Sequence, residues 1–264
     1  MTKTIAAEKD LLYAEKNGIA LITINREKQG NAISPEAVRL FHEALESARK
    51  NDYVKVVCIT GAGDRVFCSG ADLSGTMGKG SEEEKEIFGR YADLLIKLHR
   101  FEKPTLAMIN GHCLAGGTGF MLACDIVLAR EDVTFGTPEV NVGLFPMMIG
   151  ALIYRNVSRK KAMSMMLLGE RLSAAEALEM GMVTKIFPKA DFDLETGKIL
   201  TALAQKSPIG IKIGKNALNH IESMPFEEAV HFLSKQLSVI AKTEDAKEGI
   251  TAFLEKRLPM FKGK

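Results

Sequence analysis

Two short stretches of small residues lie where an apolar run of the sequence comes to an end. The first, "AGG" at 115–117, follows the run "PTLAMIN" (104–110), and the second, "SGAD" at 69–72, follows "VKVVCIT" (54–60). Small residues at a corner allow tight packing, and they also let a ligand atom approach backbone N–H groups that a helix start leaves unpaired. Two such corners predict a pair of N–H groups that donate to one ligand oxygen.

A carboxylate that could move protons is Glu139, in "FGTPEVNVGLFP" (135–146). A glutamate in an arbitrary loop is usually a surface carboxylate. In an apolar pocket, burial would raise its pKa toward the range useful for acid–base catalysis. The residues expected to form such a pocket are Val140, Val142, Leu144, Phe145, Met147 and Met148.

The composition of the chain excludes several classes of function. Its 264 residues carry a net charge of +2 and no Trp, and no basic stripe of the kind that binds nucleic acid is present. No apolar stretch reaches the roughly 18 residues of a membrane span, and we expect no signal peptide at the N-terminus. The four cysteines form no CxxC and the histidines lack metal-ligand spacing, so we expect buried thiols, no metal site and a cytoplasmic protein.

The elements that position these residues alternate along the chain. Strand-like apolar runs are expected at 18–25, 54–60, 104–110, 125–130 and 183–187. Helices are expected from Ser34-Pro35, over 81–101 and from the capping box at 173–176, with a flexible loop at 75–81. This alternation predicts an α/β core with parallel strands. From about residue 193 the pattern is only helical, with helix starts at 207, 225 and 243.

Six segments, in order, resemble the enoyl-CoA hydratase/isomerase (crotonase) superfamily over nearly the whole chain. They are "NREKQGNAIS", with Glu27 in place of the usual Pro, "RVFCSGADL", "INGHCLAGGTGFMLACDIVLA", "FGTPEVNVGLFP", "LLGERLSAAEALEMGMVTKIFP" and "EGITAFLEKRLPMF". The resemblance implies a spiral of ββα units over residues 1–192, with a helical C-terminal segment at 193–264 that forms homo-trimers, often paired into hexamers.

The resemblance also implies a ligand and a set of site residues. The ligand is an acyl-CoA thioester, with no cofactor beyond its coenzyme A part. The backbone N–H groups of Ala71 and Gly116 would form the oxyanion hole, and Glu139 would be the catalytic acid–base. Residues implied to contact the ligand are Ala32, Gly70, Asp72, Gly117, Lys28 and Lys256; Lys28, Lys256 and Arg257 are the ones implied to approach the coenzyme A phosphates.

The chain departs from the hydratases of this superfamily at one catalytic position. Hydratases use two glutamates around a water, and the first of these positions is Gly119 here. A single Glu139 favours moving a proton between two carbons, as a Δ3,Δ2-enoyl-CoA isomerase does. Slow hydration with Thr118 or a backbone group holding the water, a weakly catalytic CoA-binding homologue, and another acyl-CoA lyase or decarboxylase are the alternatives. Met147 occupies the place of the second acid of dienoyl isomerases and cannot transfer a proton.

Overall fold

The computed structural model describes residues 9–72 and 80–264, so most of the loop expected at 75–81 lies outside the described residues. Within the described chain, a six-stranded sheet has the order β1-β2-β3-β5-β7-β10, in which every neighbouring pair is parallel except β1 and β2. Its strands are β1 (Leu11–Lys16), β2 (Ile19–Ile24), β3 (Val56–Gly61), β5 (Thr105–Ile109), β7 (Ile126–Arg130) and β10 (Lys185–Phe187). The five expected strands are therefore confirmed, and β1 is an addition at the sheet edge.

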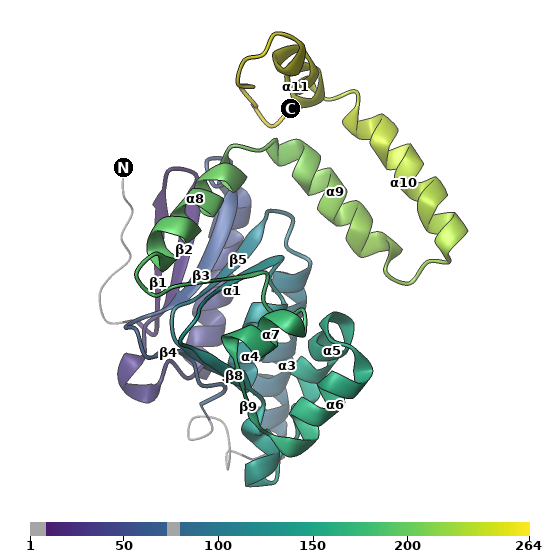
Figure 1. Ribbon diagram of the computed structural model, residues 1–264. Helices are drawn as coiled ribbons and strands as arrows, with labels where there is room; N and C mark the ends of the chain where they lie inside the picture. The colour runs from purple at the N-terminus through teal and green to yellow at the C-terminus, as the bar shows by residue number, and fades with distance from the viewer. Residues whose placement is uncertain (1–8, 73–79) are drawn as a thin grey trace.

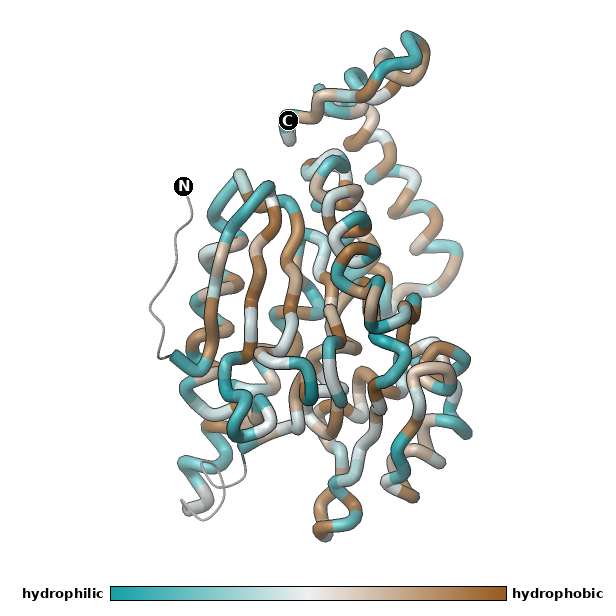
Figure 2. The backbone as a smooth tube through the Cα atoms, turned by 60° about the vertical axis from the view of Figure 1, so that its left-hand side comes forward, coloured by the Kyte–Doolittle hydropathy of each residue, from teal (hydrophilic) through white to brown (hydrophobic). Residues whose placement is uncertain are grey.

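Helices cover both faces of this sheet, which explains why its central strands are apolar throughout. Every residue of β3 is buried, as expected for a parallel strand with helices on both sides. Helices α1 (Pro35–Lys50) and α3 (Ser81–His99) belong to the larger core, and α8 (Phe192–Ala204) packs on the other face. Figure 2 shows the brown, hydrophobic residues running along the strands between these layers.

A second, smaller sheet holds the ends of the long strands close together. In the described residues it has the order β4-β6-β8-β9, built from β4 (Val66–Cys68), β6 (His112–Leu114), β8 (Thr134–Gly136) and β9 (Arg171–Ser173). Each of β3, β5 and β7 is followed by one of these short strands and then by helical structure, so the expected spiral of ββα units is confirmed. Strands of three residues are too short to produce a readable alternation of apolar and polar residues.

The remaining elements of the core are short helices between the strands. They are η1 (Glu27–Gln29), α4 (Gly116–Leu122), η2 (Pro138–Val142), α5 (Met147–Asn156), α6 (Arg159–Leu168) and α7 (Ala174–Glu179). Ser34 caps α1, and the capping box at Ser173 and Glu176 forms as expected. Helix α4 begins at Gly116, directly after Ala115, which turns the chain.

The C-terminal helices stand away from both sheets. Helices α9 (Pro208–Ile221), α10 (Phe226–Ile240) and α11 (Glu244–Leu254) form the green-to-yellow arm in Figure 1, and residues 193–264, all of which are described, contain no strand. This arm exposes large apolar side chains, among them Phe226 and Phe253 with exposed fractions of 77% and 82%. Since α8 packs on the sheet, the expected division after residue 192 stays a prediction.

Two findings bear on the expected environment of the protein. In the described part of the chain, no helix is both long and apolar enough to cross a membrane. All four cysteines are free thiols; Cys58, Cys68 and Cys113 are buried and Cys124 is half-buried. This agrees with the interpretation of the cysteines as small buried hydrophobes.

Candidate active site

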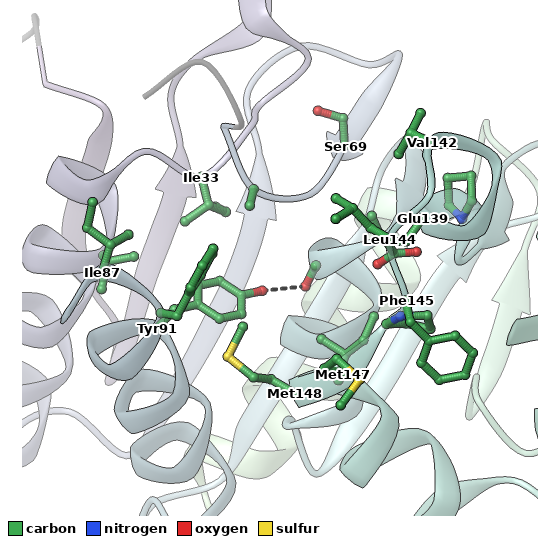
Figure 3. A pocket seen from close by; sticks show the side chains of 18 of the residues that line it. Ile33, Ser69, Ile87, Tyr91, Glu139, Val142, Leu144, Phe145, Met147 and Met148 are labelled. Carbon is green, nitrogen blue, oxygen red and sulfur yellow. Dashed lines mark hydrogen bonds between the residues drawn. The ribbon is translucent and has the colours of Figure 1, made fainter. Parts of the chain in front are cut away.

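A cavity of about 680 Å³ opens where the two small-residue corners meet helices α3 and α5. Among the described residues its wall is almost entirely apolar, and the ionisable side chains there are Glu139 and Tyr91. Figure 3 shows both residues among the apolar side chains Ile33, Leu144 and Met148. The cavity therefore combines a large apolar volume with very few polar groups, which is the usual composition of a small-molecule site.

The two corners bring the backbone of residues 70–71 against that of residues 115–116. A Cβ added to Gly116 would lie 3.4 Å from the backbone nitrogen of Ala71, and one added to Gly70 would lie 3.2 Å from that of Gly116. Within the described chain, no backbone acceptor is bound by the N–H of Ala71 or of Gly116. The two N–H groups are thus close together beside the cavity, as the sequence predicts, and can donate to one ligand oxygen.

The Ala71 corner is fixed by hydrogen bonds on both sides. Ile33 N–H donates to the Gly70 carbonyl at 2.8 Å, and the Asp72 N–H donates to the Ile33 carbonyl at 2.9 Å. In such a parallel bridge the intervening N–H of Ala71 points the other way. The Asp72 carboxylate accepts from the Arg26 guanidinium at 2.8 Å, and Arg26 also donates to the Ala32 carbonyl. Asp72 and Ala32 therefore support the corner.

The Gly116 corner depends on an unusual backbone conformation at Ala115. Ala115 has φ 50° and ψ −127°, a conformation that costs a residue with a side chain of the order of 1–3 kcal/mol. Its N–H donates to the Gly136 carbonyl at 2.9 Å, and its carbonyl accepts from Thr118 N–H at 2.9 Å. These bonds hold the strained turn, which orients the peptide that carries the Gly116 N–H.

Glu139 reaches the cavity from η2. Pro138 begins this short helix, and the chain turns away at Gly143, whose φ of 77° favours glycine. The Oε2 atom of Glu139 is buried and has no hydrogen-bond partner among the described residues. Burial raises the pKa of this carboxyl group, although a hydrogen bond to its own backbone opposes the shift. A partly desolvated carboxylate with one oxygen unpaired is suited to accept and return a proton.

Tyr91 is a polar residue of the site that lies on α3 and was not identified from the sequence. Its hydroxyl donates to the Gly116 carbonyl at 2.8 Å (the dashed line in Figure 3). The ring packs edge-on against Phe120, with centroids 5.6 Å apart. Burial, and then the negative charge of neighbouring groups including Glu139, raises the pKa of the phenol well above its usual value. Tyr91 therefore remains protonated and donates a hydrogen bond beside the Gly116 corner.

The space beside Gly119 is filled by Ile149. A Cβ added to Gly119 would collide with the Cγ2 methyl of Ile149 and would lie 3.6 Å from a methyl of Leu95. Ile149 is 4% exposed and lines the cavity from the first turn of α5. An apolar side chain thus stands where the sequence analysis noted a missing carboxylate.

Several predicted residues do not reach the cavity. Gly117 packs against Cys68, because an added Cβ would lie 2.6 Å from the Cys68 carbonyl oxygen, so its small size serves the contact between α4 and β4. Lys28 is exposed on η1 and does not line the cavity. Lys256 follows α11, which lies far from α5 in Figure 1, and neighbouring Arg257 pairs with Glu248. Within one chain, neither lysine lines the cavity.

Two expectations about individual side chains are wrong. The Thr118 hydroxyl is buried and donates to the Gly136 carbonyl at 3.2 Å, so it faces away from the cavity and cannot hold a water there. Val140 packs against Gly169 instead of the cavity, whereas the other five apolar residues expected around Glu139 do line it.

Three cavity residues were missed. Ile33 and Tyr91 face the cavity from a bridge and a helix remote in sequence from Glu139, and Ile149 faces it from a helix that was not expected. Helical spacing identifies the inward face of α3 but does not say that Tyr91 meets Gly116. For Ile149, the position after "FPMM" offered the only signal, since it lies in the first turn of the helix that follows Glu139.

Comparisons with known proteins agree with this geometry. A family model described as "Enoyl-CoA hydratase/isomerase" matches residues 14–264. The chain is 32% identical over 261 residues to 2,3-dehydroadipyl-CoA hydratase of Escherichia coli K12, covering 97% of this chain and 99% of that protein. It is 31% identical to short-chain-enoyl-CoA hydratase of Clostridium acetobutylicum, covering 95% and 97%. The crystal structure of human enoyl-coenzyme A hydratase domain-containing protein 3 superimposes with a TM-score of 0.92 at 31% identity, covering 96% and 100%.

Proposed function

Because the chain belongs to the enoyl-CoA hydratase/isomerase family, whose model matches residues 14–264, we propose that it moves the double bond of an enoyl-CoA thioester. The family membership makes it an acyl-CoA enzyme; the choice of reaction is our proposal. The single observation that carries it is the buried, unpaired Oε2 atom of Glu139 in an apolar cavity beside the N–H groups of Ala71 and Gly116.

The proposed chemistry follows from where charge develops. Removing a proton from the carbon next to a thioester carbonyl places negative charge mainly on the carbonyl oxygen. The N–H groups of Ala71 and Gly116 would bind that oxygen, and losing one such donor typically costs about 3–4 kcal/mol of transition-state stabilisation. The Glu139 carboxylate takes the proton from C2 and, as the carboxylic acid, returns it to C4, while the double bond shifts from C3–C4 to C2–C3. Atoms and charge balance without a cofactor beyond the coenzyme A part of the substrate.

Hydration is the second candidate, because relatives at 31–32% identity are named as hydratases. Adding water to a double bond requires a group to hold and activate the water while a proton is delivered. In this chain the place next to Gly119 is occupied by Ile149, and the Thr118 hydroxyl is bonded to Gly136. These contacts favour isomerisation over hydration.

The oligomeric state and the compartment are part of the proposal. The exposed apolar residues of α9–α11 support assembly through this arm into a homo-trimer or hexamer. The free thiols support a reducing compartment such as the cytoplasm. Some relatives, such as the Dictyostelium discoideum protein, carry "mitochondrial" in their names, which makes the mitochondrion the alternative.

The test compares two substrates in the same preparation. Purified protein is given 3-hexenoyl-CoA and crotonyl-CoA, and the conjugated product and the hydrated product are measured. We expect isomerisation of the first substrate and little hydration of the second, with isomerisation lost in Glu139→Gln. Efficient hydration of crotonyl-CoA would refute the isomerase proposal, and binding of both thioesters without turnover would support the weakly catalytic alternative.

A further inference from the structure

Met148 lines two cavities at once. It belongs to the wall of the 680 Å³ cavity and also to that of a groove of about 330 Å³ between α3 and α5. In Figure 3 its side chain lies between Tyr91 and Met147 in the wall of this larger cavity, which we call the acyl cavity. The side chain of one residue is thus shared by the wall of the candidate active site and that of the groove.

The groove follows the facing sides of two helices. From α5 it receives Met148, Ala151, Leu152 and Arg155, which are spaced i, i+3, i+4 and i+7 and so form one helix face. At 1.5 Å per residue, this face runs about 10 Å away from the acyl cavity. The α3 side contributes Ala92, Leu95, Ile96 and His99.

The character of the groove changes along its length. Near Met148 the groove is lined by small or aliphatic side chains, such as Leu95, Ala151 and Leu152. At its distal end are Arg100, Arg155 and a hydrogen-bonded pair, His99 and Glu222, whose Nε2 and Oε1 atoms are 2.9 Å apart. An apolar chain that enters at Met148 would therefore have apolar partners over the first turns and would meet polar groups at the end.

The side chain of Met148 can change conformation more easily than that of its neighbour Ile149. It is partly exposed, and its unbranched side chain with three rotatable bonds adapts to irregular space at low cost. Ile149 beside it is β-branched and buried against Gly119, so it holds a fixed position. In the wall between the cavity and the groove, the side chain of Met148 can therefore be displaced, whereas that of Ile149 is held in place.

We propose that Met148 is a gate through which the distal part of a long, unbranched acyl chain passes from the acyl cavity into the groove between α3 and α5. This inference rests on the proposed function, and it names the substrate class as thioesters of longer aliphatic acids. The polar distal end of the groove limits the length that is accommodated. Each further methylene group that is buried strengthens binding about fourfold, so occupancy of the groove appears directly as a preference for long chains.

Binding of unreactive saturated thioesters tests the gate independently of turnover. Dissociation constants for butanoyl-CoA and dodecanoyl-CoA are measured by titration calorimetry for the wild type and for Ala151→Phe, which places a bulky ring in the groove without touching the acyl cavity. We expect the wild type to prefer the long chain by about tenfold or more, and Ala151→Phe to lose about tenfold of that preference.

Ala202→Phe controls for nonspecific effects, because it makes the same change at an exposed position of α8 that lines neither the cavity nor the groove. It should keep the long-chain preference. The gate is refuted if the wild type has no preference, or if folded Ala151→Phe retains it within about twofold. Isomerisation of 3-hexenoyl-CoA in the same samples reports separately on the proposed function. If the long-chain preference is present but no isomerisation is detected, the proposed function is refuted and the gate is not.

Discussion

The Cγ2 methyl group of Ile149 occupies the space that a side chain on residue 119 would need, and this contact removes one acid from the site. The two residues are therefore complementary, because the missing side chain of Gly119 leaves a space that the side chain of Ile149 fills. A carboxylate introduced at this position by a single substitution would overpack this core contact, which typically costs about 1–3 kcal/mol.

We predict that Gly119→Glu alone lowers stability without adding hydratase activity, and that Gly119→Glu combined with Ile149→Ala folds and hydrates crotonyl-CoA. The added carboxylate would then share the cavity with Glu139 and could hold a water. Melting temperatures and hydration rates of both variants check this, with an expected gain of about tenfold or more over the wild type. The matched control is Gly119→Gln with Ile149→Ala, which has the same shape but no acid. Equal hydration by the control would show that the acid is not responsible.

The smallness of Gly116 leads to a second prediction. In Gly116→Ala the new Cβ would lie 3.4 Å from the Ala71 nitrogen and 2.7 Å from the Tyr91 hydroxyl oxygen, so it would fill the place of the thioester oxygen. We expect kcat/KM to fall about 10²–10³-fold. The control Gly214→Ala in α9 adds a methyl where nothing lies within 4 Å, and it should leave activity intact while stabilising the helix by about 0.5–1 kcal/mol. Full activity in Gly116→Ala would rule out this placement of the carbonyl.

Tyr91 should affect catalysis by holding the Gly116 corner in position. Tyr91→Phe removes the 2.8 Å hydrogen bond to the Gly116 carbonyl and leaves the ring packed on Phe120. A bond of this kind is worth about 0.5–1.5 kcal/mol, so we expect kcat to fall up to about tenfold while KM changes little. A purely structural role predicts a lower melting temperature with normal kcat, and steady-state kinetics beside thermal denaturation separate the two.

The sequence predicts the long elements of the fold and the corners of the site, but not how distant side chains meet. The five parallel strands could be predicted because each lies in a mostly apolar run, and Glu139, Ala71 and Gly116 were located by motif. The small sheet was missed because its three-residue strands carry no periodic signal, whereas β10, which is equally short, lies in the longer run at 183–187. Tyr91 lies in the helix expected over 81–101, whereas Ile149 lies in α5, which was not expected. The contacts of these side chains with Gly116 and Gly119 arise only from the packing of the two helices.

The pKa of Glu139 predicts the pH dependence of turnover. Burial raises this pKa above its ordinary value of 4.5, and only the ionised carboxylate can accept the proton from C2. The kcat/KM for isomerisation should therefore fall as the pH drops through a midpoint above 4.5. A pH–rate profile measures this midpoint, and its disappearance in Glu139→Gln assigns it. A profile that is flat through this range would contradict the role of Glu139 as base.

Stability should respond to pH in the opposite direction. A folded-state pKa above the unfolded one favours the folded protein at low pH, and that contribution is lost as the pH rises through the folded-state pKa. Glu139→Gln should therefore raise the melting temperature at neutral pH, where the wild type buries a charge, and have less effect below pH 4.5. The same variant thus loses activity and gains stability at neutral pH.

Exchange of the C2 proton tests the central claim most directly, because it reports proton removal without requiring the double bond to move. Hexanoyl-CoA or 3-hexenoyl-CoA is incubated with the protein in D2O, and deuterium at C2 is followed by mass spectrometry. We predict incorporation by the wild type and a loss of about 10²-fold or more in Glu139→Gln. Undiminished exchange in folded Glu139→Gln, or no exchange in a wild type that binds both thioesters, would contradict the account.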